Sequence, residues 1–159
     1  MAQMKGQIKG NLKAPRNVKI AVVVSEYNRE ITHKLEASAL KELKKAGVDE
    51  RHISTFYAPG AFELPYLCQR VIQEFKPDGI VALGCIIKGE TPHFDFIASS
   101  CSNGIMDISL KHHTPISFGV LTPHSLAQAH DRIQGGKRGD KGVEAARTLL
   151  KLLQWKRSP

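Results

Sequence analysis

Short β-branched runs alternate along this chain with longer segments whose apolar residues recur at helical spacing. The first run, 18–25, is rich in valine and isoleucine, which is typical of a strand buried on both faces of a parallel sheet. In the next segment, 29–47, the apolar positions follow a helical period, and Gly47 stands where a helix commonly ends. The pattern therefore predicts a strand followed by a helix.

Further units repeat this alternation. The expected strands span 52–60 with its closing turn, 79–87 and 115–122, and the expected helices span 61–75, 94–110, 125–133 and 142–155. Pro65 falls in the first turn of its helix, where proline is tolerated. Strands that alternate with helices predict an α/β fold. We expect a single-domain, three-layer α/β/α sandwich with a four-stranded parallel sheet.

The chain has the size and composition of one globular domain. It has 159 residues, of which 42% are hydrophobic and 24% charged, and this is enough apolar material for a full core. We expect a basic N-terminal tail over 1–17 and one domain over 18–159. No apolar run could cross a bilayer, and the first residues lack the apolar centre of a secretory signal. The sequence thus predicts a cytoplasmic protein without a membrane partner.

Cysteine and histidine spacing does not indicate a metal site. The three cysteines, Cys68, Cys85 and Cys101, are widely spaced and lie among apolar or small residues. This pattern fits neither a disulfide framework nor a zinc site, and no H-x-x-x-H motif occurs. We therefore expect no bound metal.

A formal net charge of +8 would suit nucleic acid, an anionic surface or phosphorylated small molecules. Much of the charge lies near the N-terminus, in the loop around Lys137 and Arg138, and at the C-terminus. The stacking aromatics and signature motifs of an RNA reader are missing. The charge alone is therefore only a weak indication of a nucleic-acid partner.

Ligands of α/β sheets bind outside the carboxyl ends of the strands, so we expect the functional site in the loops that follow the strands. The loop after the first strand contains no glycine, which excludes a dinucleotide fingerprint or a Walker A motif at that point. Hydride transfer and NTP hydrolysis are therefore disfavoured. Tyr27 in this loop offers a flat face for a planar ring, or is an ordinary half-buried aromatic. Glu63 either interacts favourably with the dipole of the helix that it enters, or binds the hydroxyl groups of a polyol.

The loop 88–93 combines features suited to an anion and to proton transfer. Gly89 frees the backbone, Thr91 supplies a hydroxyl, and the helix that follows directs unpaired N–H groups toward the loop. His93 begins this helix; it is either structural or a group that exchanges protons near neutral pH. Arg132 could bind phosphate through two N–H groups, or could be an exposed helix-end residue.

Five motifs, taken together and in this order, resemble the 6,7-dimethyl-8-ribityllumazine synthase family. They are APGAFELP, LGCIIKGETPHFDF, FGVLT, QAHDR and DKGVEAA, and the resemblance runs from about 18 to 153. It implies a flavodoxin-like fold and the penultimate step of riboflavin biosynthesis. In that step 5-amino-6-(D-ribitylamino)uracil condenses with 3,4-dihydroxy-2-butanone 4-phosphate, releasing phosphate and water without a cofactor.

The resemblance assigns one set of residues to the pyrimidine substrate. Tyr27 matches the aromatic residue that stacks on the ring. Ala61 and Glu63 match contacts of the ribityl chain, and Ile86 and Ile87 match residues whose backbone reads the ring.

It assigns a second set to the phosphate and to proton transfer. Gly89, Glu90 and Thr91 match the phosphate loop, and Arg132 would reach that loop from a neighbouring subunit. His93 matches the proton shuttle. The remaining matches are Glu144, which would orient His93, together with Lys141 near the site and Phe118 in substrate binding.

The resemblance also implies a homo-oligomer with active sites between adjacent subunits. The segment 133–140 is about one residue longer than in many relatives, and Asp140 stands where asparagine is common. Because this loop lies at contacts between pentamers in the family's shells, we favour a pentamer over a sixty-subunit capsid. Two alternatives stay open: a basic anion- or RNA-binding module without activity, and a purely structural shell protein.

Overall fold

The central sheet has four parallel strands in the order β2-β1-β3-β4. The computed structural model describes residues 12–157, and within them the strands are β1 (Ile20–Ser25), β2 (Ile53–Ala58), β3 (Gly79–Cys85) and β4 (Ile116–Leu121). Ile20 of β1 lies opposite Ile53 of β2 and Gly79 of β3, so the strands begin nearly level. All four carboxyl ends therefore lie at one end of the sheet.

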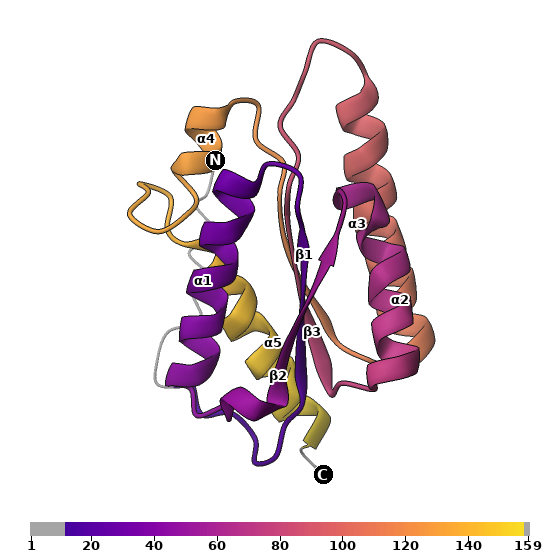
Figure 1. The fold of residues 1–159 in the computed structure, drawn as a ribbon, viewed down its shortest axis with the longest axis vertical. Coiled ribbons are helices and arrows are strands. Elements are labelled where there is room, and N and C mark those ends of the chain that lie inside the picture. The colour runs from indigo at the N-terminus through magenta and orange to yellow at the C-terminus, as the bar shows by residue number, and fades with distance from the viewer. Residues whose placement is uncertain (1–11, 158–159) are drawn as a thin grey trace.

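Helices cover both faces of this sheet (Figure 1). They are α1 (Arg29–Lys45), α2 (Leu64–Phe75), α3 (His93–His112), α4 (Leu126–His130) and α5 (Lys141–Arg157). One face packs against α1 and α5, and the other against α2 and α3. The expected three-layer sandwich with a four-stranded parallel sheet is confirmed.

The two central strands explain why the sheet is covered on both sides. Every residue of β1 and β3 is buried. Val22 and Val24 point into the α1 and α5 layer, whereas Ala21 and Val23 point into the α2 and α3 layer. Each fully buried Val or Leu contributes about 1.5–3 kcal/mol, so both layers are needed to cover these strands.

Glycine allows the closest approach between helices α1 and α5. A Cβ added at Gly142 would lie 2.3 Å from the carbonyl oxygen of Leu35. Gly47 ends α1 with a φ of +93°, as its position in the sequence predicts.

The expected boundaries of two helices are wrong. Residues Ala61–Glu63 form a short 3₁₀ turn, and α2 begins only at Leu64. Since Pro65 has no N–H to donate back to Ala61, an α-helical start at that residue is not supported. The expected helix 125–133 is reduced to α4, in which Ser125 accepts a capping hydrogen bond from the Gln128 N–H at 3.2 Å.

The part of the expected basic tail that can be described lies against the domain. The Ala14 N–H donates to the Ala46 carbonyl at 2.8 Å, and the Gln154 side chain donates to the Lys13 carbonyl at 3.1 Å. Residues 1–11 of that tail lie outside the described residues. Among the described helices, none is both long and apolar enough to span a bilayer.

Candidate active site

The loops at the carboxyl end of the sheet enclose two separate hollows. We call the first the α3 pocket; its volume is about 570 Å³ and it lies between the β1–α1 loop, the turn before α2, and the start of α3. We call the second the α4–α5 pocket; its volume is about 510 Å³ and it lies against β4, α4 and α5. Together they contain nearly every residue that the sequence singles out.

The α3 pocket gathers the residues expected at the pyrimidine and at the phosphate. Those that line it are Tyr27, Ala61, Glu63, Ile86, Ile87, Gly89, Thr91 and His93. Glu90 lies in the same loop, is exposed, and does not line the hollow.

Tyr27 is held by its backbone while its ring stays open to solvent. The Glu26 N–H donates to the Ala58 carbonyl at 2.8 Å, and the Tyr27 N–H donates to the Pro59 carbonyl at 3.2 Å. The tyrosine is nevertheless 72% exposed, so it is not an ordinary half-buried aromatic. An aromatic face held at the edge of a hollow can stack on a planar ligand.

Glu63 lies just before α2 but makes no capping hydrogen bond through its side chain. Its carboxylate lies close to Gly60, where an added Cβ would be 3.0 Å from Oε2. The carboxylate is exposed and lines the α3 pocket. A carboxylate that is not used as a cap can accept hydrogen bonds from hydroxyl groups.

His93 is the first residue of α3, directly after Pro92. Its N–H donates to Thr91 Oγ1 at 3.5 Å, and the N–H groups of Asp95 and Phe96 donate to the Pro92 carbonyl at 3.0 and 3.3 Å. The positive end of the dipole of this 20-residue helix lies at the 88–93 loop, where it favours an anion. The imidazole has no hydrogen-bond partner within residues 12–157.

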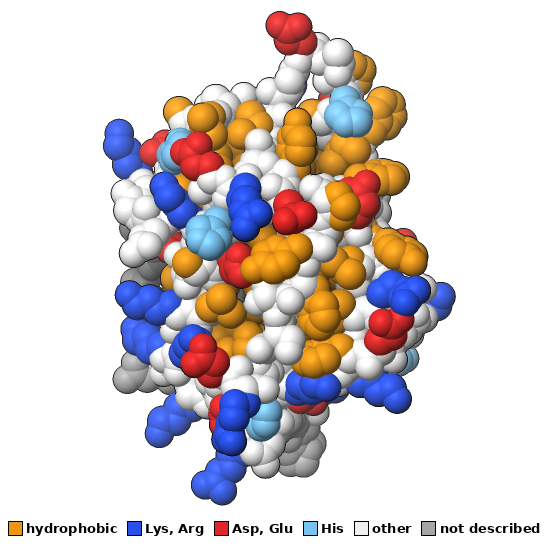
Figure 2. Space-filling view, in the orientation of Figure 1, with side chains coloured by type: hydrophobic (Ala, Val, Ile, Leu, Met, Phe, Trp, Pro, Cys, Tyr) orange, Lys and Arg blue, Asp and Glu red, His pale blue; other side chains and the backbone are white. Residues whose placement is uncertain are grey.

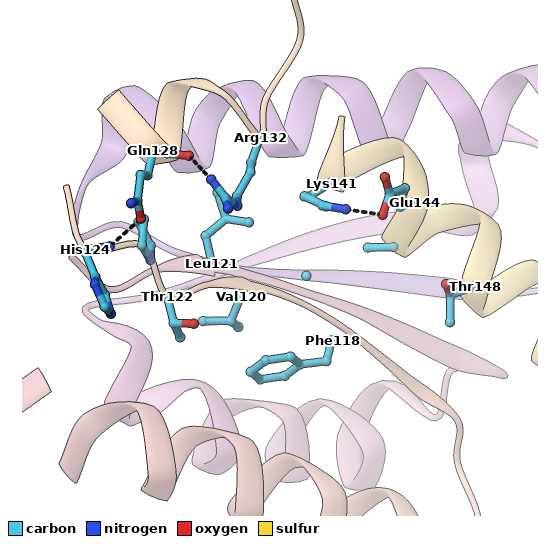
Figure 3. A pocket seen from close by; sticks show the side chains of 13 residues that line it. Phe118, Val120, Leu121, Thr122, His124, Gln128, Arg132, Lys141, Glu144 and Thr148 are labelled. Carbon is cyan, nitrogen blue, oxygen red and sulfur yellow. Dashed lines mark hydrogen bonds and ion pairs between the residues drawn. The ribbon is translucent and has the colours of Figure 1, made fainter. Parts of the chain in front are cut away.

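The α4–α5 pocket contains the cations and the remaining candidate residues (Figure 3). Arg132 Nη1 donates to the Gln128 carbonyl at 2.7 Å, which steadies the guanidinium. Lys141 Nζ lies 2.6 Å from Glu144 Oε2. Phe118 lies across the hollow on β4 and is 45% exposed. The arrangement offers cationic donors beside an open aromatic face.

Glu144 and His93 do not meet within one chain. Glu144 lines the α4–α5 pocket and pairs with Lys141, whereas His93 lines the α3 pocket. Among the described residues, no hydrogen bond or ion pair joins Glu144 to His93, so the expectation that Glu144 orients His93 stays a prediction. The same holds for Arg132 and the phosphate loop.

The glycine-rich segment after α4 is ordered by backbone hydrogen bonds. The Arg138 N–H donates to the Asp131 carbonyl at 2.7 Å, and the Lys141 N–H donates to the Arg132 carbonyl at 2.9 Å. Asp140 Oδ1 accepts from the N–H groups of Gly142 and Val143 at 3.0 and 3.3 Å. Asp140 thus starts α5, a task that aspartate and asparagine perform about equally well.

The cysteines are unsuited to nucleophilic chemistry. Burial raises the pKa of Cys85, which lines the α3 pocket, to about 11, and that of Cys101 to about 11. Burial also raises the pKa of Cys68 to about 12. All three thiols stay protonated at neutral pH. Within the described range, no group of three or more His, Cys, Asp or Glu side chains could hold a metal ion.

Sequence reasoning missed several residues that line these hollows. Asn28, Phe62 and Phe94 lie in the α3 pocket, and His124 and Gln128 in the α4–α5 pocket. The Phe94 and His124 rings meet edge to face, with centroids 6.3 Å apart. Their positions shortly after the strands could have marked them as pocket residues. Their side chains alone indicated no particular chemistry.

Comparison with known proteins shows the family of this chain. The model of the 6,7-dimethyl-8-ribityllumazine synthase family matches residues 17–157. Proteins of that name from Helicobacter pylori strains Shi470 and P12 are each 42% identical to this chain over 146 residues, which cover 92% of this chain and 93% of theirs. One from Helicobacter acinonychis strain Sheeba is 40% identical over the same shares. The chain belongs to the 6,7-dimethyl-8-ribityllumazine synthase family.

Proposed function

We propose that this chain is a transferase that forms 6,7-dimethyl-8-ribityllumazine at sites completed by two adjacent copies. The substrates are 5-amino-6-(D-ribitylamino)uracil and 3,4-dihydroxy-2-butanone 4-phosphate, and the by-products are phosphate and water. Family membership supports this reaction over a module that only binds anions or RNA and over a purely structural shell. The cytoplasmic location expected from the sequence stays a prediction.

The division of the candidate residues between two hollows carries the proposal. The α3 pocket has an aromatic face, a helix N-terminus and an imidazole, but no lysine or arginine among residues 12–157 lines it. The α4–α5 pocket has Arg132, Lys141 and Glu144, but lacks the loop suited to phosphate. Each pocket has what the other lacks. Placing the α4–α5 pocket of one copy over the α3 pocket of the next brings both sets together.

Exposed apolar side chains near both pockets support such an assembly. Phe62 and Phe96 are 57% and 69% exposed near the α3 pocket, and Phe118 is 45% exposed in the other. Figure 2 shows hydrophobic side chains along the α2 and α3 side of the face in view, whereas Lys and Arg are most numerous toward its lower end. Apolar surface of this kind commonly becomes an interface between subunits.

The chemistry requires proton transfers and a leaving phosphate. In the proposed site, Tyr27 stacks on the pyrimidine, the backbone of Ile86 and Ile87 reads its edge, and Ala61 and Glu63 bind the ribityl chain. Holding both substrates in one hollow makes attack of the amine on the ketone effectively intramolecular.

Phosphate and protons are handled at the start of α3. Gly89, Glu90 and Thr91 with the helix N-terminus would hold the phosphate, and Arg132 of the adjacent copy would neutralise its charge. His93 would carry protons during imine formation, phosphate loss and ring closure. Glu144 of the adjacent copy would orient the imidazole.

We favour a pentamer over a sixty-subunit shell. The longer segment 133–140 folds back onto Asp131 and Arg132 through backbone hydrogen bonds. Sedimentation or light scattering of the purified protein distinguishes the two assemblies directly, because their masses differ twelvefold.

The function is tested by mixing the purified chain with both substrates and following lumazine absorbance and phosphate release. We expect both products to appear together and faster than in the uncatalysed condensation. Absence of any acceleration would refute the proposed function. A parallel assay with unphosphorylated dihydroxybutanone is the control for the phosphate subsite.

A further inference from the structure

The three residues after β1 connect the ends of the two neighbouring strands, β2 and β3. On one side, the N–H groups of Glu26 and Tyr27 donate to the carbonyls of Ala58, the last residue of β2, and Pro59, which follows it. On the other side, Asn28 Nδ2 donates to the carbonyl of Cys85, the last residue of β3, at 2.8 Å. The segment therefore joins the end of β2 to the end of β3, and its residues Tyr27 and Asn28 line the α3 pocket.

Asn28 has a backbone conformation that most residues avoid. Its φ of 57° and ψ of 46° are left-handed, a region that asparagine tolerates better than other side chains with a Cβ. It directly precedes α1, where an asparagine side chain usually caps the helix. Here the side chain makes no capping bond. The amide is used instead to reach β3, 57 residues further along the chain.

The bond to Cys85 fixes the peptide that leads into the ring-reading segment. Ile86 and Ile87 follow Cys85 directly, and the Ile86 N–H is held on its far side by the Leu121 carbonyl at 2.8 Å. Tyr27, which precedes Asn28, carries the ring that faces the same hollow. Asn28 thus connects Tyr27, which would stack on the face of a flat ligand, to the Ile86 and Ile87 backbone, which would bind its edge.

We propose that Asn28 is a positioning residue for the pyrimidine substrate, setting the spacing between the Tyr27 ring and the backbone of Ile86 and Ile87. This inference rests on the proposed function of the α3 pocket. Loss of the amide lets the β1–α1 loop move relative to β3, which weakens stacking and edge recognition together. The phosphate loop has a separate support, because the Lys88 N–H donates to the Pro123 carbonyl at 3.0 Å.

Two substitutions separate the amide from the backbone conformation. Asn28→Gly keeps the left-handed backbone without strain but removes the donor. Asn28→Asp keeps the size and the conformation but places a carboxylate oxygen against the Cys85 carbonyl. The matched control is Lys76→Gly, since Lys76 is also left-handed, with a φ of 52°, and ends α2 at the opposite end of the sheet.

The test measures KM for each substrate and kcat in the assembled enzyme, with equilibrium binding of the pyrimidine alone as a second readout. We expect Asn28→Gly to raise the pyrimidine KM about three- to tenfold, the value of one hydrogen bond, and Asn28→Asp to raise it further. The butanone phosphate KM should stay near that of the parent enzyme. Lys76→Gly should change neither constant.

Unchanged pyrimidine affinity in both Asn28 variants would overturn the proposal, as would equal rises in both KM values or a loss of thermal stability alone. These outcomes differ from failure of the proposed function, in which the parent enzyme itself would not accelerate lumazine formation.

Discussion

The α3 pocket and the α4–α5 pocket lie at the same end of one sheet but are built differently. Backbone conformation shapes the α3 pocket, through a left-handed asparagine, a 3₁₀ turn and a helix N-terminus. Charged side chains shape the α4–α5 pocket: Arg132 donates to the backbone carbonyl of Gln128, and Lys141 pairs with the Glu144 carboxylate. The first is suited to recognising a flat ring and an anion, and the second to supplying charge. The proposed site between two copies rests on this division.

The largest expected effect comes from His93. Replacing it with alanine should lower kcat about a hundred- to ten-thousandfold, because a group that carries protons would be lost. Mixing His93→Ala chains with Arg132→Ala chains during assembly should then restore activity. With random mixing, about a quarter of the interfaces would combine the intact α3 pocket of an Arg132→Ala chain with the intact α4–α5 pocket of a His93→Ala chain. Steady-state rates of the mixed and unmixed preparations check this, and mixtures no more active than their parents would contradict the shared site.

Removal of the charge in the α4–α5 pocket should have the next largest effect. Arg132→Ala should raise the KM for the butanone phosphate about ten- to a hundredfold, the value of a charge-assisted hydrogen bond. The pyrimidine KM should be unaffected, since that ring is assigned to the other pocket. Titration of each substrate at saturating levels of the other measures both. Arg138→Ala is the control, because Arg138 is an exposed arginine of the same loop. A rise in the pyrimidine KM alone would reverse the assignment.

Removal of the exposed ring in the α3 pocket should have a moderate effect of the opposite kind. Tyr27→Ala should raise the pyrimidine KM about three- to tenfold through loss of stacking, whereas Tyr27→Phe should restore most of the affinity. Because the tyrosine is 72% exposed, the melting temperature should change little in either variant. Substrate titration together with thermal denaturation separates binding from stability. A large fall in melting temperature would show instead that the ring supports the fold.

The fold could be predicted from sequence because its strongest signals are local. The continuous runs in β1 and β3 are buried on both faces, and Gly47 ends α1 as expected. The separation of the candidate residues could not be predicted in the same way. Phe118 lies on β4, at the edge of the sheet, and lines the α4–α5 pocket, whereas His93 follows β3 and lines the α3 pocket. Strand order depends on packing between distant segments, and no local pattern encodes it.

Asn28 shows a second limit of sequence reasoning. The stretch before α1 contains a residue type that favours helix caps, so the ordinary expectation is a local bond to the next turn. The structure shows a bond to β3 instead. Only the three-dimensional proximity of the two loops makes this partner available, because the chain between them forms α1, β2 and α2.

The smallest expected effect tests whether the two pockets of one chain depend on each other. His130 Nε2 at the end of α4 lies 3.0 Å from Glu30 Oε1 in the first turn of α1. This pair therefore connects α1, which follows the β1–α1 loop of the α3 pocket, to α4, which borders the α4–α5 pocket. Both side chains are well exposed, and such surface pairs contribute about 1 kcal/mol or less. If each pocket serves a different interface, Glu30→Gln should leave kcat and both KM values near those of the parent. Steady-state kinetics at low and high salt check this. A selective loss of butanone phosphate affinity in Glu30→Gln would show that α1 positions Arg132 within the same chain, and the two pockets would then have to be treated as one coupled unit.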